Sequence, residues 1–171
     1  MRSFAEERRS GTLELLLTLP VSDLQVVLAK WAAAMLIVTA LLGLLFPFVV
    51  ALGGLAPLPW APAVAGFAGL WLLGAGFVAA GICVSALTAS QVVASAATYG
   101  LLVWSWLLTW NEAAASEWWL QVFRRVSLFD RFESFARGLV RLGDVVFLVE
   151  FCVLLLFLAV KVLGARQWRG R

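Results

Sequence analysis

A run of 81 residues, from Trp31 to Asn111, contains no Asp, Glu, Lys or Arg. One helical crossing of a bilayer needs about 20 apolar residues, because the hydrocarbon is roughly 30 Å thick and a helix rises about 1.5 Å per residue. The run is therefore long enough for three crossings joined by short turns. A water-soluble domain would spread charges over its whole surface, so this part of the chain is predicted to lie in lipid.

Charged residues, 13% of the chain, are confined to three regions: before residue 31, between 112 and 150, and after 160. Helices satisfy their backbone polar groups within one segment, and the apolar runs lack the alternation of membrane β-strands. The predicted fold class is all-α: a polytopic membrane protein with four transmembrane helices, a cytoplasmic helix before them and external amphipathic helices. The net charge of +3 comes from clusters that flank spans, so no nucleic-acid partner is expected.

Four segments are predicted along the chain. Residues 1–30 form a cytoplasmic segment, which ends in a capping box from Ser22 to Gln25 that starts a new helix. Residues 31–111 hold three spans, near 31–52, 63–87 and 91–110, with a kink or thinning near Pro47. The first two spans are separated by a proline-rich, non-helical turn over 53–62. Residues 112–144 form external amphipathic helices, and 145–171 form the last span and a cytoplasmic tail.

Basic residues at the two ends of the chain predict its orientation. Arg2, Arg8, Arg9 and Lys30 precede the first span, and four basic residues follow from Lys161 onward. Short cytoplasmic segments carry an excess of Lys and Arg, so both termini are predicted to be cytoplasmic, in the inner membrane of the cell. Five arginines between residues 112 and 144 argue weakly against this orientation.

The residues needed for catalysis within the membrane are missing. The chain has no histidine, its two lysines flank spans, and no aspartate pair lies within a span, so proteolysis by a serine, aspartyl or zinc route has no suitable residues. A P-loop sequence is also absent. Cys83 and Cys152 lie in apolar runs, where cysteine is usually a packing residue. We expect no catalytic residue, metal or cofactor, and any nucleotide energy would come from another subunit.

Small residues in the second span recur four apart, as in Gly76 and Ala80 and again in Gly81 and Ser85. This spacing predicts close helix packing, with a substrate-lining face as the alternative. The third span carries hydroxyl groups that either contact cargo or hydrogen-bond to backbone carbonyls. They belong to Ser95, Thr98, Ser105 and Thr109.

Glu150 is the one acid well inside a span, about 9 Å past Asp144 along a helix. An ionisable group at depth is costly, so it indicates a transport pathway or a partner. The alternative is a glutamate close enough to the interface to reach water or Arg141.

The sequence FAEERRSGTLELLLTLPVS, from Phe4 to Ser22, followed by Lys30 at the head of a span, resembles the cytoplasmic loop of type 2 ABC transporter permeases. The similarity is closest to the subgroup of gliding-motility and copper-enzyme-maturation permeases. A second similarity, to the external helices and final span of that subgroup, is carried by Ser127, Phe132, Glu133, Phe135, Ala136, Arg137, Gly138, Asp144 and Arg166.

The resemblance implies an exporter half whose loop docks, as a coupling helix, into a separate cytoplasmic ATPase subunit. The positions that match the family pattern are Glu7, Gly11, Thr12, Glu14 and Pro20. Leu13, Leu16 and Leu17 independently give a short helix an apolar face with no core of its own, which requires either a partner groove or the membrane surface.

The resemblance also implies a second permease, either another copy of this chain or a sister subunit, and lipid around both. Relatives have six spans, two of them before this loop, so we expect the chain to be an incomplete permease, either a fragment or the product of a start assigned too late. The rival interpretation is a non-transporting membrane scaffold that recruits a cytoplasmic protein.

Overall fold

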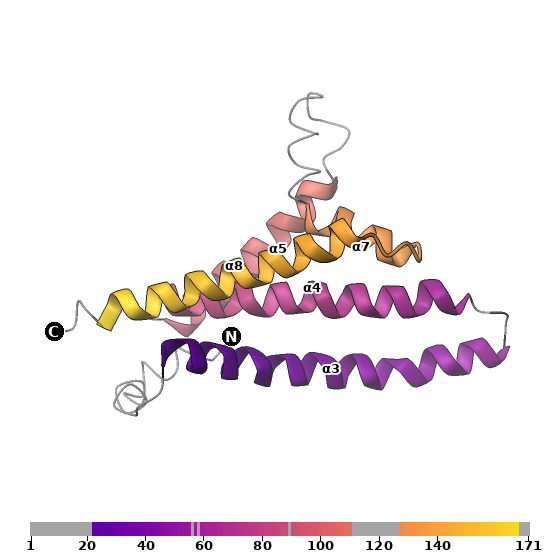
Figure 1. Ribbon diagram of the computed structural model, residues 1–171, viewed down its shortest axis with the longest axis horizontal. Helices are drawn as coiled ribbons and strands as arrows, with labels where there is room; N and C mark the ends of the chain where they lie inside the picture. The colour runs from indigo at the N-terminus through magenta and orange to yellow at the C-terminus, as the bar shows by residue number, and fades with distance from the viewer. Residues whose placement is uncertain (1–21, 56, 58, 89, 111–126, 168–171) are drawn as a thin grey trace, which may run out of the picture.

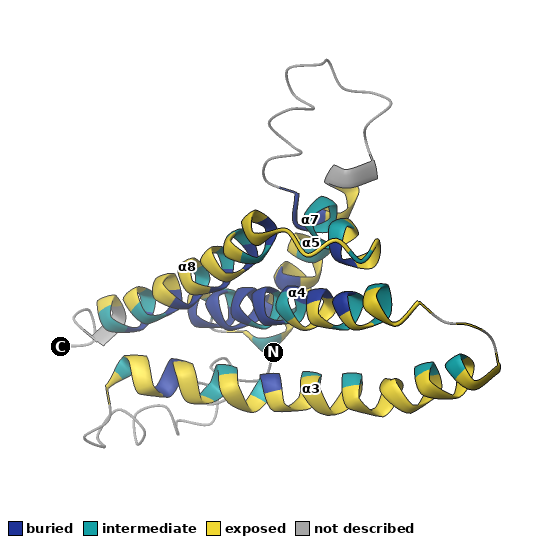
Figure 2. Cartoon of the chain, turned by 45° about the vertical axis from the view of Figure 1, so that its right-hand side comes forward, coloured by how far each residue is buried: buried dark blue, intermediate teal, exposed yellow. Residues whose placement is uncertain are grey.

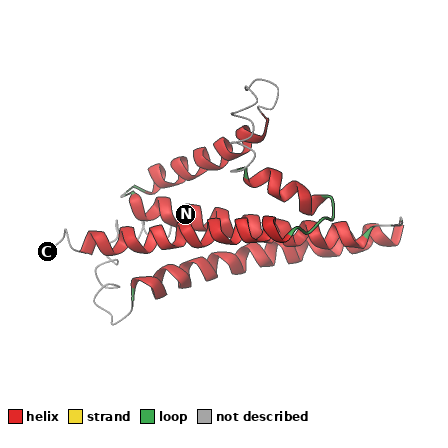
Figure 3. Ribbon diagram, turned by 45° about the horizontal axis from the view of Figure 1, so that its top comes forward, coloured by secondary structure: helices red, strands yellow, loops and turns green. Residues whose placement is uncertain are grey.

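The computed structural model describes residues 22–55, 57, 59–88, 90–110 and 127–167. Their helices, in chain order, are α3 (Asp23–Leu55), α4 (Trp60–Leu87), α5 (Gln91–Trp110), α7 (Leu128–Ala136) and α8 (Leu142–Gln167). These ranges contain no strand, as Figure 3 shows. The all-α fold class is therefore confirmed.

Within the described residues, three helices are long and apolar enough to cross a membrane by length and composition. They are α3, α4 and residues 142–165 of α8. α5 has the bounds predicted for the third span but is not among the three, so this fourth crossing stays a prediction. The chain is accordingly an all-α membrane protein with several membrane-spanning helices.

The prediction of a wholly non-helical turn over residues 53–62 is wrong at both ends. α3 continues to Leu55, and α4 already begins at Trp60 with Pro62 in its first turn. A proline is tolerated there because the first N–H groups of a helix have no intrahelical partner to lose. α3 also continues as a helix through Pro47.

α4 is the central helix, and each of the other four described helices packs against it. Figure 2 shows most of its second half buried, whereas α3 is exposed over nearly its whole length. α3 and α4 form a long antiparallel pair, and α8 returns beside α4 (Figure 1). The start of α3 and the end of α8 therefore lie at the same end of the bundle.

The buried side chains form two clusters along α4. The first joins α3, α4 and α8 and comprises Val26, Val27, Met35, Ala75, Ala79, Ile82, Cys83, Ala86, Cys152, Leu156, Ala159 and Leu163. The second lies under α7 and comprises Leu73, Leu128, Phe135 and Leu148.

Glycines on α4 let its neighbours approach closely. A Cβ added at Gly76 would lie 3.1 Å from Cδ1 of Phe151 on α8, and one at Gly74 would lie 3.2 Å from Val38 on α3. Contact of this kind holds helices together in lipid, where exclusion of water cannot. The packing interpretation is therefore confirmed at Gly76.

Candidate functional site

The residues predicted to dock a partner lie outside the described residues: Glu7, Gly11, Thr12, Leu13, Glu14, Leu16, Leu17 and Pro20. Their docking role stays a prediction. The structure does describe the helix that follows them, beginning at Ser22.

The first turn of α3 is fixed by the predicted capping box. The Ser22 backbone N–H donates to Oε1 of Gln25 at 3.1 Å, and the Gln25 backbone N–H donates to Oγ of Ser22 at 3.3 Å. Two N–H groups that the helix leaves unpaired are thereby satisfied. The prediction of a helix start near Ser22 is confirmed.

The start of α3 is packed directly onto the end of α8. Val27 is fully buried in the same cluster as Leu163 of α8, and a Cβ added at Gly164 would lie 3.5 Å from Oδ2 of Asp23. Because packed side chains deform little, the start of α3 is held firmly against α8 and α4.

One backbone carbonyl joins three helices. The carbonyl oxygen of Ala75 on α4 accepts from the indole Nε1–H of Trp31 at 3.2 Å and from the Cys152 thiol at 3.5 Å. Trp31 comes from α3 and Cys152 from α8. Both cysteines, Cys83 included, are buried and free, which fits the packing interpretation. The described residues contain no group of three His, Cys, Asp or Glu that could hold a metal ion.

Hydroxyl groups on α5 donate to their own helix. Ser95 donates to the Val92 carbonyl, Thr98 to the Ala94 carbonyl at 2.7 Å, and Ser105 to the Leu102 carbonyl at 2.7 Å. Of the two alternatives, backbone bonding is therefore observed at these three positions. The side chain of Thr109 lies outside the described residues.

α7 lies lengthwise against the first half of α4. The Phe129 and Phe77 rings are 6.0 Å apart between centroids, a Cβ added at Gly69 would meet Cβ of Phe135 at 2.6 Å, and one at Gly138 would meet Cα of Pro62 at 3.1 Å. Phe77 is about 26 Å along α4 from Trp60. α7 thus runs antiparallel to α4 and extends well down that span, which differs from a helix lying flat across the end of the bundle.

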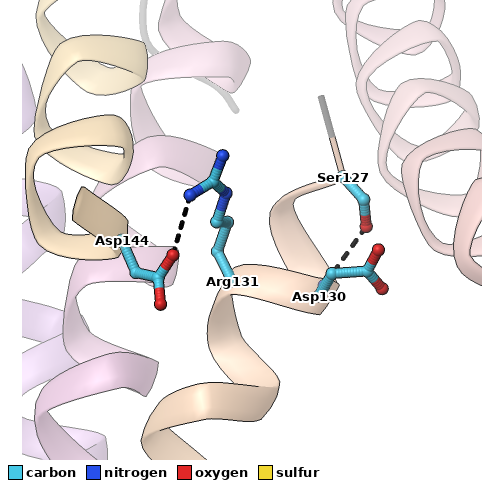
Figure 4. A network of polar contacts seen from close by, with 4 residues as sticks. All are labelled: Ser127, Asp130, Arg131 and Asp144. Carbon is cyan, nitrogen blue, oxygen red and sulfur yellow. Dashed lines mark hydrogen bonds and ion pairs between the residues drawn. The ribbon is translucent and has the colours of Figure 1, made fainter. Parts of the chain in front are cut away.

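A side-chain cap starts α7. Oγ of Ser127, itself buried, accepts from the backbone N–H of Asp130 at 3.2 Å (Figure 4). The cap satisfies one amide of the first turn and fixes the entry of the helix against its neighbours. One turn of α7 then brings Arg131 to face α8.

The Arg131 and Asp144 side chains form an ion pair between α7 and α8, with Nη1 of the arginine 2.8 Å from Oδ1 of the aspartate. The guanidinium also lies over the ring of Phe147, 4.7 Å from its centroid. The Asp144 side chain is 7% exposed and belongs to the first turn of α8, where the helix dipole favours a negative charge. Its second oxygen, Oδ2, is buried and has no hydrogen-bond partner among the described residues.

Glu150 lies on the exposed side of α8. It is six residues after Asp144, so the two carboxylates point to different sides of the helix. Arg141 precedes α8, about 14 Å away along the helix axis, and no bond joins it to Glu150 in the described part of the chain. The pathway role of Glu150 and the interfacial alternative therefore both stay predictions.

The pairing of Arg131 with Asp144 was not predicted from the sequence, in which Arg131 is one of five arginines between residues 112 and 144 and Asp144 is a position of the second family similarity. One feature of the sequence could have predicted this ion pair. Asp144 stands at the start of a span that is otherwise strongly apolar, and ionisable residues beside lipid usually pair with one another.

Comparison with known proteins gives one family match. The family model described as ABC-2 family transporter protein matches residues 1–117 of the 171. The matched part includes the predicted docking segment and α3 to α5 and ends before α7. No match was found among curated proteins.

Proposed function

We infer the function of this chain from its family, because it belongs to the ABC-2 family of transporter proteins. It is a permease component of an ABC transporter and a multi-pass membrane protein. Such a permease works with an ABC ATPase. We propose that hydrolysis takes place on a separate cytoplasmic ATPase subunit, since the sequence contains no P-loop pattern.

Coupling between the two subunits is proposed to run through residues 10–20 into α3. The observation that carries this route is the packing of the start of α3, at Val26 and Val27, onto the end of α8. A movement of the docking segment would therefore shift the spans together. The substrate would then be exported by alternating or channel-like rearrangement of those spans.

We also propose a subgroup for this chain, a second permease beside it, and an orientation in the membrane. The residues from Phe4 to Ser22 support the gliding-motility and copper-enzyme-maturation subgroup. The long exposed apolar face of α3 supports a second permease packed beside it, with lipid over the remainder. The basic ends of the chain support cytoplasmic termini in the inner membrane.

Co-expression with an ABC ATPase subunit from the same genome tests the function. A permease should raise the ATP hydrolysis rate of that subunit several-fold in membranes, because a coupling helix changes the equilibrium between its conformations. The ATPase expressed with an unrelated membrane protein is the control. A flat hydrolysis rate would favour the alternative, a scaffold that recruits a cytoplasmic protein without nucleotide-driven motion.

Replacing Glu150 by glutamine should lower transport about tenfold at unchanged expression, provided that its exposed carboxylate faces the pathway. The matched control is Glu133→Gln, which removes an exposed acid of α7 whose ion pair with Arg137 contributes little, as surface pairs do. Substrate flux into inverted vesicles is the measurement. Equal flux in Glu150→Gln and the parent removes the pathway role and leaves the interfacial alternative.

A further inference from the structure

Glu150 is level with the middle of α4, as the contacts of the two residues after it show. A Cβ added at Gly76 of α4 would lie 3.1 Å from Cδ1 of Phe151, and the Cys152 thiol donates to the Ala75 carbonyl at 3.5 Å. Gly76 is about 24 Å from the start of α4 and about 17 Å from its end. Because α4 contains no charged residue, this level is at the depth of hydrocarbon.

The same level of α3 presents an apolar surface. A Cβ added at Gly74 of α4 would lie 3.2 Å from Val38, and Leu36 and Ile37 beside it are 71% and 64% exposed. Lys30 precedes Val38 by about 12 Å along α3. Exposed aliphatic side chains this far from a charge are suited to lipid, which agrees with the depth inferred from α4.

Glu150 is the one charged member of an exposed apolar stripe along α8. The residues four before it and three, four and seven after it share its side of the helix. Each of these four is between 45% and 58% exposed, so the described helices leave the stripe uncovered. We call this surface the Glu150 stripe, and it consists of Val146, Glu150, Val153, Leu154 and Phe157.

The carboxylate of Glu150 has no hydrogen-bond donor in the described part of the chain. Arg131, whose guanidinium lies over the Phe147 ring one turn before Glu150, bonds to Asp144 instead. The ion pairs and hydrogen bonds observed among the described residues do not include Glu150. Acyl chains cannot donate a hydrogen bond, and ionisable side chains at this depth usually pair with another side chain. The stripe therefore lacks a partner for its charge as well as for its apolar surface.

We propose that the Glu150 stripe docks a transmembrane helix of a partner protein, and that this helix carries an arginine or lysine at the middle of the bilayer. The negative charge of Glu150 selects the cation, and the apolar members supply the close contact that holds helices together in lipid. A second copy of this chain, paired through the same stripe, would bring two carboxylates together, and like charges repel. The inference goes beyond the proposed transport function and does not depend on ATP hydrolysis.

Designed transmembrane peptides test the docking. The full chain, labelled at its C-terminus, is placed in nanodiscs with a labelled peptide of about 20 leucines and alanines that has one arginine at its centre. Energy transfer between the labels gives the affinity. A hydrogen bond to a charged group exceeds a neutral one by about a factor of ten in affinity. Glu150→Gln should therefore bind the arginine peptide about tenfold more weakly than the parent does.

A second peptide and a second variant serve as controls. A peptide with leucine in place of the arginine should bind the parent about tenfold more weakly than the arginine peptide. Glu133→Gln removes an exposed acid of α7 outside the stripe and should leave the affinity unchanged. The proposal is overturned if Glu150→Gln binds the arginine peptide as tightly as the parent, or if Glu133→Gln weakens binding equally. It is also overturned if the parent binds both peptides equally, and water on a transport pathway would then be the neighbour of Glu150. A chain that prefers the arginine peptide but stimulates no ATPase would support the docking and count against the transport function.

Discussion

Replacing Leu16 and Leu17 together by aspartate should abolish copurification of the ATPase subunit, with a loss of affinity of about a thousandfold. Each leucine buried in a partner groove contributes roughly 1.5–3 kcal/mol, and every 1.4 kcal/mol is about a factor of ten in affinity. Two losses therefore amount to roughly 3–6 kcal/mol before the cost of placing carboxylates in an apolar groove, and about 4 kcal/mol already corresponds to a thousandfold loss. Pull-down from solubilised membranes, with both subunits expressed at parent levels, is the measurement.

The matched control is Leu15→Asp. In a helix, Leu15 lies about 200° from Leu13, whereas Leu16 and Leu17 lie within about 60° of it, so the control charge falls on the opposite face. Binding should survive this change. Full copurification with the double variant would show that no apolar face of this segment docks the ATPase, and the amphipathic helix would then rest on the membrane surface instead.

A leucine at position 69 should lower the free energy of unfolding by about 3 kcal/mol. Gly69 faces Cβ and Cγ of Phe135 at 2.6 and 2.8 Å from an added Cβ, so no rotation of the phenylalanine relieves the clash and α7 as a whole must move. For a chain of this size, a loss of 3 kcal/mol lowers the thermal midpoint by roughly 6–12 °C. Circular dichroism on the chain in nanodiscs follows the transition.

Gly66 provides the comparison, because a Cβ added there meets nothing within 4 Å. Gly66→Leu should leave the thermal midpoint nearly unchanged. A midpoint for Gly69→Leu equal to that of Gly66→Leu would contradict the close packing of α7 on α4.

Local signals in the sequence predicted the parts of the fold that depend on neighbours along the chain. The capping box at Ser22 and Gln25 was recognised from two residues three apart, and the structure shows both of its hydrogen bonds. The bounds of α5 were correct because polar turn residues precede Gln91. The turn over residues 53–62 was extended too far, because Pro62 was interpreted as a helix breaker although it occupies a first-turn position.

Contacts between distant residues could not be read in the same way. Trp31 and Cys152 meet at Ala75 only because three helices pack at one level, and Arg131 reaches Asp144 only because α7 folds back along α4. Neither contact leaves a periodic pattern in the sequence from which it could be predicted. Of the predicted site residues, the docking segment lies outside the described residues, and Glu150 is placed on an exposed helix side that its sequence context did not specify.

The length of α3 has a consequence for the membrane around it. From Trp31 to its end at Leu55 the helix has no charged residue and is about 38 Å long, whereas typical hydrocarbon is roughly 30 Å thick. Such a mismatch is relieved when a helix tilts or when longer acyl chains gather around it. Because α4 packs along α3, a tilt of α3 would tilt α4 with it, and we expect the angle of the α3–α4 pair to depend on the thickness of the surrounding lipid.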